Sequence, residues 1–300
     1  MMAPFSDKPQ NITIGVLGGT GRFGAPYIRE FLAQGLAVRI LARTPGPVAE
    51  RFPGADVRRG SMMVVDDVRR TLDGTAGGLL ITPVGGNDDT AIELQAARVA
   101  AAAAQMVRLP HLIYVSLIQH TTPTGVPLLD VKREIEDMIA ASGIPWSSLR
   151  TGCCMDAWLV FFPLFMKLGF CLFPIRSQHR FSFTSEPDVA RAATLLIRRQ
   201  QILGGPVDVI DPRARNLREV VDAYEKATGR RLRLIGHWLL PLLKILRPVV
   251  FRWGFPTGAS RVRLFSYFDR HDWVGNPDQI GQAIPDFKPV SMEDHLRARC

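Results

Sequence analysis

The feature that most constrains this chain is a glycine-rich loop near the N-terminus, residues 18–24, with the sequence GGTGRFG. An apolar, β-branched run at 11–17 precedes the loop and is typical of a buried strand. Residues 20–34 follow with apolar side chains at helical spacing, and Gly35 closes that segment as a C-terminal glycine does. The pattern predicts a strand, a tight turn at the glycines and a helix.

The same alternation continues through the first half of the chain. Further strand-like runs lie at 36–42, 78–82 and 111–117, and helix-like segments at 65–73, 88–105 and 127–142. Strands separated by helices at this pitch form a parallel, doubly wound sheet with right-handed crossovers. We therefore predict an α/β protein with a Rossmann domain at 1–155 and a smaller, partly helical substrate region at 156–300.

Each key glycine of the loop has a separate expected role. Gly18 permits the tight turn, Gly21 lets the backbone approach a pyrophosphate, and Gly24 allows the helix to pack close to the sheet. The N-terminus of that helix offers free N–H groups and a partial positive charge to phosphates. In this strand–turn–helix context the spacing predicts a dinucleotide site, although a glycine-rich turn without a ligand is the alternative. The other loop side chains expected beside the dinucleotide are Thr20, Arg22 and Phe23.

The residue after the second strand indicates which dinucleotide is bound. An acidic residue there would bond the ribose 2′-hydroxyl of NAD, but this chain has Arg43, and Arg39 stands nearby on the same strand. A planar guanidinium suits the 2′-phosphate of NADP. The sequence thus favours NADP(H) over NAD(H). The alternative is an ordinary arginine facing solvent at a strand end.

Composition excludes several other functions. The formal net charge is +9, which could serve nucleic acid, an anionic membrane or a phosphorylated cofactor. The basic residues are spread as arginine pairs with no basic run of five or six and no nucleic-acid-binding motif, so we expect no nucleic acid partner. The four cysteines form no C-x-x-C pair, so we expect no metal site and reduced thiols. No secretory signal opens the chain, which favours a cytoplasmic protein.

Several segments together resemble a known family. These are the glycine loop, VRILAR at 38–43, LITP at 80–83 and SGIPWSSLR at 142–150. They are similar to the NmrA-like branch of the atypical short-chain dehydrogenases over roughly the first 200 residues, and residues 183–192 resemble a segment beside that family's substrate cleft. The branch includes isoflavone-reductase-like enzymes, quinone reductases and non-catalytic redox sensors. One departure is Gly60-Ser61, where the family usually has Gly-Asp near the adenine.

The resemblance implies a role for Lys132. The wider superfamily uses a Tyr-x-x-x-Lys pair, but Leu128 stands four residues before Lys132, and none of the four tyrosines precedes a lysine at that spacing. In isoflavone-reductase-like relatives the lysine is itself the catalytic or cofactor-positioning group. A lysine near an apolar pocket can lose pKa and act as a base or proton donor near neutrality. The alternatives are binding of the nicotinamide ribose, or an exposed lysine paired with Glu136 at i, i+4.

Four more residues are candidates for the same site. Ser116 ends the strand 111–117, and the carboxyl ends of such strands face the ligand crevice. His120 follows in the loop and could donate a proton to a substrate oxygen. A capping or buried hydroxyl and a surface histidine are the respective alternatives. Thr82 and Pro83 end the strand 78–82 and are expected to line the nicotinamide side.

Two apolar stretches, 157–175 and 238–251, bear on the substrate. Prolines and cations interrupt both, which counts against a membrane span, whereas peripheral membrane contact stays open. The first stretch would line a cleft suited to an apolar or aromatic small molecule, with Trp158, Phe161, Phe162, Phe165 and Phe170. We therefore expect NADP(H)-dependent reduction of an apolar carbonyl, enone or quinone. The alternative is a redox sensor that binds NADP(H) without turnover and acts through a protein partner.

Overall fold

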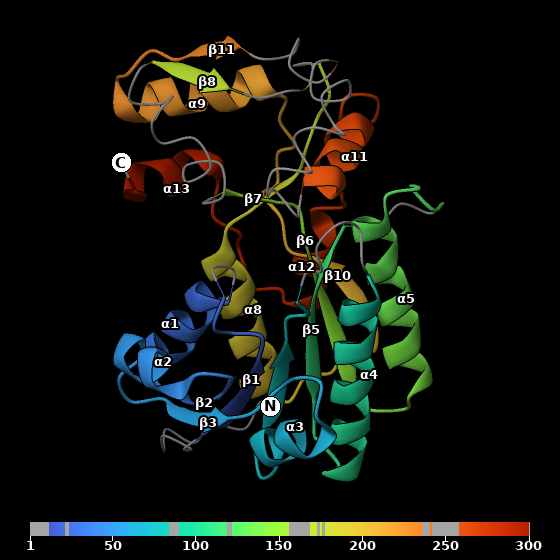
Figure 1. Cartoon of the computed structure of the whole chain (residues 1–300). Helices are drawn as coiled ribbons and strands as arrows, with labels where there is room; N and C mark the ends of the chain where they lie inside the picture. The colour runs from blue at the N-terminus through green and yellow to red at the C-terminus, as the bar shows by residue number, and fades with distance from the viewer. Residues whose placement is uncertain are drawn as a thin grey trace.

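The structure is a computed structural model, and the residues that it describes are 12–21, 24–83, 90–118, 122–155, 169–172, 175, 178–235, 241 and 258–299. They form a layered α/β body with a second group of helices above one edge of the sheet (Figure 1).

A seven-stranded parallel sheet forms the centre, in the order β10-β6-β5-β4-β1-β2-β3. Its strands are β1 (Thr13–Leu17), β2 (Ala37–Ala42), β3 (Asp56–Arg59), β4 (Gly77–Leu80), β5 (Leu112–Leu117), β6 (Trp146–Thr151) and β10 (Pro206–Asp208). The predicted doubly wound parallel sheet is confirmed. The strand order reverses between β1 and β4, and ligands of such sheets bind outside the carboxyl ends of the strands at this point.

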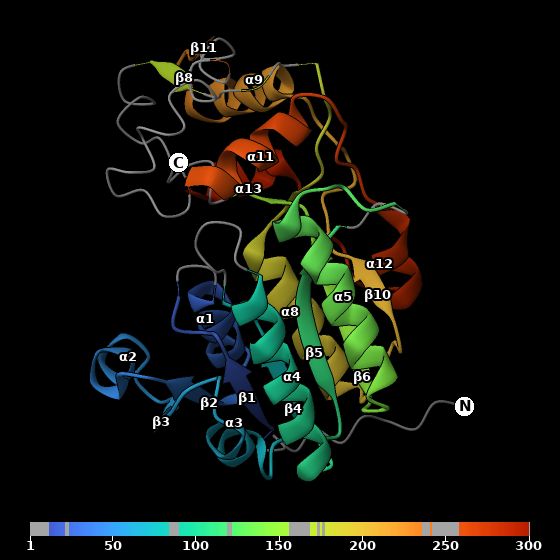
Figure 2. The ribbon, with the colours of Figure 1, turned by 45° about the vertical axis from the view of Figure 1, so that its right-hand side comes forward.

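Helices cover both faces of the sheet (Figures 1 and 2). The helices of this part are α1 (Ala25–Ala33), α2 (Pro45–Arg51), α3 (Val65–Leu72), α4 (Ala91–Met106), α5 (Pro127–Ala141) and α8 (Glu186–Arg198). One apolar cluster joins α1 and α8 to the sheet, and another joins α3, α4 and α5 to it. Successive strand residues point to opposite faces, so Ile113 enters the first cluster and Tyr114 the second. The first helix begins at Ala25 and not at Thr20, because the glycine turn occupies the residues between.

Residues after 155 contribute to both parts of the molecule. Helix α8, strand β10 and helix α12 (Asp278–Ala283) belong to the sheet layers, and Ile280 of α12 lies in the first apolar cluster. The other elements lie above the carboxyl edge of the sheet, together with β7 (Cys153–Cys154), which precedes residue 155 (Figure 2). They are β8 (Phe170–Leu172), β9 (Phe183–Thr184), α9 (Leu217–Thr228), β11 (Arg233–Ile235), α11 (Gly258–Phe268) and α13 (Met292–Arg299). A third apolar cluster, which includes Phe181 and Trp273, holds this upper part together.

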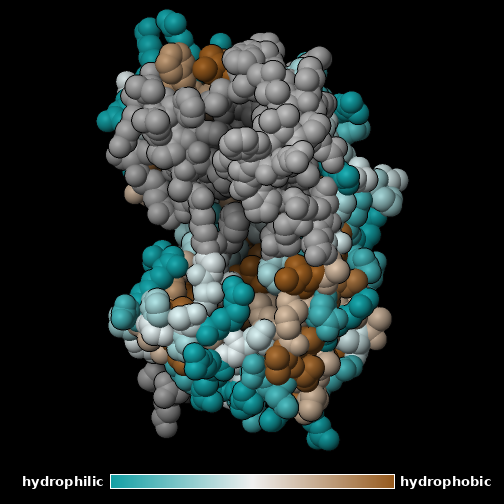
Figure 3. All heavy atoms as spheres, in the orientation of Figure 1, coloured by the Kyte–Doolittle hydropathy of each residue, from teal (hydrophilic) through white to brown (hydrophobic). Residues whose placement is uncertain are grey.

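The apolar stretches noted in the sequence fall mainly outside the described residues, including Trp158, Phe161, Phe162 and Phe165. Of that group Phe170 is described, in β8, and is 36% exposed. Within the described ranges, no helix combines the length and the apolar character needed to cross a membrane. Figure 3 shows apolar side chains mixed with polar ones on the face over α4, where Ile92 and Met106 are exposed.

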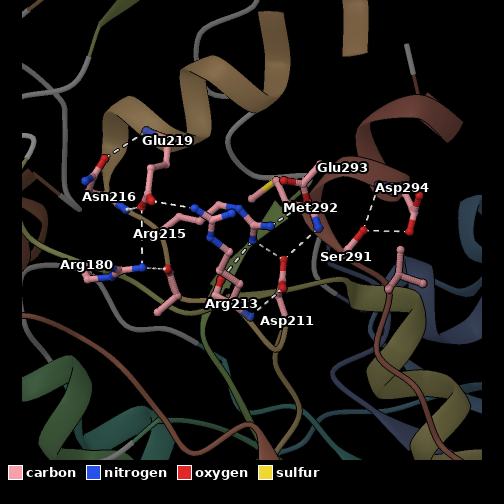
Figure 4. A network of polar contacts seen from close by, with 12 residues as sticks. Arg180, Asp211, Arg213, Arg215, Asn216, Glu219, Ser291, Met292, Glu293 and Asp294 are labelled. Atoms are coloured by element: carbon pink, nitrogen blue, oxygen red, sulfur yellow. Dashed lines mark hydrogen bonds and ion pairs between the residues drawn. The ribbon is translucent and has the colours of Figure 1, made fainter. Parts of the chain in front are cut away.

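A buried ion-pair network ties the C-terminal helix α13 to the upper part (Figure 4). The guanidinium of Arg215 donates to the carboxylates of Asp211 and Glu293, the latter at 2.6 Å. Asp211 Oδ2 also accepts the backbone N–H of Met292 at 2.8 Å, and the Asp211 N–H donates to the carbonyl of Phe183 at 2.7 Å. One buried arginine thus links β9, the loop before α9 and α13.

We predict that Arg215→Ala lowers the free energy of unfolding by about 3 kcal/mol, because it leaves the buried Asp211 carboxylate without its cation. Chemical denaturation followed by circular dichroism measures the change. The matched control is Arg297→Ala, since Arg297 and its partner Asp294 are both largely exposed, and it should cost less than about 0.5 kcal/mol. Equal losses for the two variants would contradict a structural role for the network.

Candidate functional site

The glycine loop has a backbone that other residues could not reproduce. Gly18 has φ +81°, and a Cβ there would lie 1.9 Å from the carbonyl oxygen of Ile81, so both conformation and contact require glycine. At Gly21, by contrast, no described atom lies within 4 Å of an added Cβ. The loop therefore presents open space at Gly21, as expected where a ligand approaches the backbone.

Gly24 packs closely, as expected, but its neighbour is the glycine loop rather than a sheet strand. A Cβ on Gly24 would lie 2.4 Å from the Cα of Gly19. A Cβ on Gly19 would in turn lie 2.6 Å from Val16 Cγ1 of β1 and 2.8 Å from Ile28 Cδ1 of α1. Two glycines, not one, bring α1 against the first strand.

The N-terminus of α1 has no side-chain cap and no acidic residue in its first turn. Its first two residues leave no backbone donor free, because the Ala25 N–H bonds the Gly21 carbonyl at 3.1 Å and Pro26 has no N–H. The positive end of the helix dipole still favours a phosphate there. The carboxyl ends of β1 and β4 meet beside this terminus, at the reversal of strand order.

The two arginines predicted near the ribose have different surroundings. Arg43 follows β2, is exposed, and has no ion-pair partner among the described residues. Arg39 instead donates to Asp56 Oδ2 at 2.9 Å and to the Asp73 carbonyl at 2.7 Å. These bonds hold Nε and Nη1 of Arg39 against Asp56 and the end of α3, so Arg39 is directed away from a phosphate contact at the end of β2. Arg43 remains the candidate.

Sequence reasoning missed a third arginine beside the loop. Arg51, at the end of α2, lies with Nη1 3.5 Å from the carbonyl oxygen of Thr20, and its guanidinium lies 5.2 Å from the ring centroid of Phe52. No helix was expected at 45–51, so nothing in the sequence placed Arg51 near the loop.

A carboxylate does lie near Ser61, the position where the family usually has an aspartate, but it comes from α3. Ser61 stands where that aspartate would be, and its backbone N–H donates to Asp67 Oδ2 at 2.9 Å. Asp67, from α3, thus supplies a carboxylate at this end of β3.

Lys132 lies in a buried polar cluster between α4, α5 and the sheet. Its Nζ donates to Glu93 Oε1 and to Thr82 Oγ1, each at 3.0 Å. Lys132 Nζ also lies over the ring of Tyr114, 5.9 Å from the ring centroid. Thr82 follows the end of β4, so Lys132 reaches the carboxyl edge of the sheet. The structure therefore brings together two of the predicted site residues, Thr82 and Lys132.

The alternative of an exposed lysine paired with Glu136 is wrong. The side chain is buried rather than exposed, and it pairs with Glu93 rather than with Glu136. Glu136 instead accepts hydrogen bonds from Arg150 Nε at 3.0 Å and from Ser148 Oγ at 2.7 Å, both on β6. The i, i+4 spacing places Glu136 on the same face of α5 as Lys132. Glu136 nevertheless pairs with the guanidinium of Arg150, which lies on the neighbouring strand β6.

The charge state of Lys132 also differs from the sequence hypothesis. Burial on its own lowers the pKa of Lys132, but the neighbouring Tyr114 and Glu93 outweigh it, and the pKa lies above its usual value. Lys132 therefore stays protonated at neutral pH. Burial raises the pKa of Glu93, and the ammonium of Lys132 opposes that rise. In this arrangement Lys132 is a cation and hydrogen-bond donor.

Two buried polar atoms, Glu93 Oε2 and Ser116 Oγ, have no hydrogen-bond partner among the described residues. Ser116 is two residues beyond Tyr114 on β5 and so points to the same face of the sheet. Buried polar groups are normally satisfied, so each of these two atoms is a candidate contact for a bound polar ligand or water.

The remaining predicted residues are distributed as follows. Pro83 follows Thr82 at the carboxyl end of β4, and Thr20 is exposed in the glycine loop. Arg22, Phe23 and His120 lie outside the described residues. Among the described residues no cluster of histidine, cysteine or acidic side chains could hold a metal ion.

Comparison with known proteins defines the family. The model of the NmrA-like family matches residues 10–284. The chain belongs to the NmrA-like family. A reductase of Streptomyces griseus subsp. griseus, (4-alkanoyl-5-oxo-2,5-dihydrofuran-3-yl)methyl phosphate reductase, is 29% identical over 219 residues, which cover 73% of this chain and 74% of the relative.

Solved structures share the fold of this NmrA-like chain. The NADPH complex of the Escherichia coli quinone oxidoreductase QOR2 has a TM-score of 0.76 at 18% identity, covering 95% of this chain and 99% of that one. The Citrobacter sp. triphenylmethane reductase with NADP(H) has a TM-score of 0.74 at 15% identity, covering 96% and 99%. The negative transcriptional regulator NmrA has a TM-score of 0.67 at 18% identity, covering 96% and 95%.

The loop geometry predicts opposite results for two glycine substitutions. Gly21→Val should leave the free energy of unfolding nearly unchanged and remove NADPH binding, because its side chain enters the open space where a pyrophosphate would lie. Gly24→Val should destabilise the fold by about 1–3 kcal/mol, because its side chain overlaps the Gly19 backbone. Denaturation and NADPH fluorescence titration measure the two effects. Loss of stability in Gly21→Val would show that this space is already filled.

Proposed function

We propose that this protein is an NADP(H)-dependent oxidoreductase that reduces an apolar carbonyl, enone or quinone. The observation that carries the proposal is the placement of two features at one edge of the sheet. These are an uncapped helix N-terminus behind a glycine loop and the buried, protonated Lys132. The reductases among its relative and structural neighbours support the same reaction class.

The residues present fit a dinucleotide. Gly21 and the N-terminus of α1 would hold the pyrophosphate, and exposed Arg43 would pair with a 2′-phosphate. Thr82 and Pro83 would lie beside the nicotinamide, with Lys132 donating to its ribose. NADPH supplies a hydride when it is bound; the chain supplies its orientation. NAD(H) would lack the group that Arg43 is placed to recognise.

Lys132 would act on the substrate as a fixed cation. A carbonyl, enone or quinone that accepts a hydride develops negative charge on its oxygen, and a preorganised ammonium stabilises such charge. That oxygen then takes one proton from water, which completes the two-electron reduction, while Lys132 keeps its own proton. Ser116, whose Oγ is an orphaned buried atom on the same face, would be a second donor. We assign no step to His120, which lies outside the described residues.

The substrate region would come from the part of the chain after residue 155. Its described elements lie above the carboxyl edge of the sheet, where a substrate must meet the cofactor (Figure 1). The aromatic residues of the stretch 157–175 would give this region its preference for apolar or aromatic molecules.

A redox sensor is the second candidate, and one sequence feature favours it. Leu128 stands where the superfamily has its acid–base tyrosine, and the regulator NmrA shares the fold. A sensor would bind NADP(H) without turnover and act through a protein partner. Steady-state NADPH oxidation over a panel of quinones, enones and aldehydes separates the two. Substrate-dependent oxidation supports the enzyme, whereas tight binding without oxidation supports the sensor.

Arg43 provides the test of cofactor choice. We predict that Arg43→Ala weakens NADPH binding by tenfold or more, because a charge-assisted contact is worth about 1.5–3 kcal/mol, and leaves NADH binding unchanged. Arg98→Ala is the control, since Arg98 is exposed in the middle of α4. Fluorescence titration with both cofactors gives the affinities. An equal loss for NADPH and NADH would contradict a contact with the 2′-phosphate.

A further inference from the structure

Glu93 is a buried acid that belongs to none of the sequence motifs. It lies in the first turn of α4, is 1% exposed, and faces Lys132 of α5 across the carboxyl end of β4. A carboxylate buried to this degree is very costly unless a cation pairs with it. Glu93 and Lys132 therefore stabilise each other's charged forms.

The contacts of Lys132 fix its position as well as its charge. Glu93 Oε1 and Thr82 Oγ1 each lie 3.0 Å from Nζ and approach it from different elements. With these two acceptors in place, the ammonium is held at the edge of the sheet. Only a small part of the Lys132 side chain, 8%, remains exposed.

The other charged groups nearby are already engaged elsewhere. Glu136, one turn further along α5, is held by Arg150 of β6. Asp130, in the first turn of α5, accepts hydrogen bonds from Thr124, and its charge also acts on Tyr267 of α11. The remaining titratable groups facing Lys132 are Glu93 of α4 and Tyr114 of β5. Of these two, Tyr114 stays neutral at neutral pH because burial raises its pKa above the usual value. Glu93 is therefore the acid that faces Lys132, with Oε1 3.0 Å from Nζ.

We propose that Glu93 is the positioning residue of Lys132. It holds the ammonium against Thr82 and keeps it protonated, so that Lys132 serves cofactor and substrate as a permanent cation. This inference rests on the proposed function in one respect: it assumes that Lys132 contacts bound NADP(H). Glu93 itself contacts neither ligand in this account and acts only through Lys132.

The test compares NADPH affinity against pH in the wild type, Glu93→Gln and Glu136→Gln. Glutamine keeps the size of Glu93 but removes its charge, so burial should lower the pKa of Lys132 into the measured range. We expect wild-type affinity to stay flat between about pH 7 and about pH 9. Glu93→Gln should bind about tenfold more weakly at the upper end, where the ammonium has lost its proton. Glu136→Gln removes an equally buried carboxylate that does not contact Lys132, and should keep the flat profile.

A second readout needs no cofactor. Only a neutral amine reacts with an acylating reagent, so Lys132 in the Glu93→Gln apoprotein should be acetylated at least tenfold faster than in the wild type. Peptide mass spectrometry after acetic anhydride treatment measures this rate. Glu93→Asp, which restores the charge on a shorter side chain, should return the rate toward the wild-type value. If glutamine prevents folding, Glu93→Ala, which also removes the charge, replaces Glu93→Gln in both readouts with the same expected results.

The outcomes separate this inference from the proposed function. A wild-type pH profile and a wild-type acetylation rate in Glu93→Gln, or in Glu93→Ala where it takes that place, would overturn the role of Glu93 while leaving NADPH binding intact. The role of Glu93 would also be overturned if Glu136→Gln showed the same altered pH profile as Glu93→Gln. The effect would then be general to the loss of a buried carboxylate. A wild type that fails to bind NADPH at every pH would instead overturn the proposed function, and the acetylation rates would still decide the role of Glu93.

Discussion

The close approach of the glycine loop to its neighbours is the constraint on which the rest of the site depends. Gly18 turns the chain with a left-handed backbone against the Ile81 carbonyl, and the contact between Gly19 and Gly24 sets α1 against β1. These contacts leave the first turn of α1 uncapped at the point where strand order reverses. A larger side chain at either packing position would move the positive end of the helix away from the crevice.

Two buried ion pairs lie between the sheet and the helices α4 and α5. Glu93 pairs with Lys132, and Glu136 pairs with Arg150. Each pair joins a helix to a second element, so the charges are fixed in place by the same packing that builds the core. Such pairs add little net stability compared with apolar residues, but breaking one is costly. Their value here would be functional, since a cation with a fixed position and charge is what a reductase site requires.

Much of the fold followed from local sequence, but the partners within the site did not. The glycine spacing and the alternation of apolar runs identified the parallel sheet and its ligand edge. Lys132 was singled out by resemblance, yet its partner Glu93 is 39 residues away in the sequence, so the helical i, i+4 rule indicated Glu136 instead. Arg39 was grouped with Arg43 because they share a strand. Only the pairing of β2 with β3 shows that Asp56 faces Arg39 and occupies it.

A crystal structure of the protein grown with NADP⁺ tests the central claim most directly. The account predicts the pyrophosphate against the Gly21 backbone at the N-terminus of α1, and the 2′-phosphate beside Arg43. It also predicts a ribose hydroxyl within hydrogen-bond distance of Lys132 Nζ, with the Glu93 contact retained. A nucleotide bound elsewhere, or a Lys132 that remains turned away from the ribose, would contradict it.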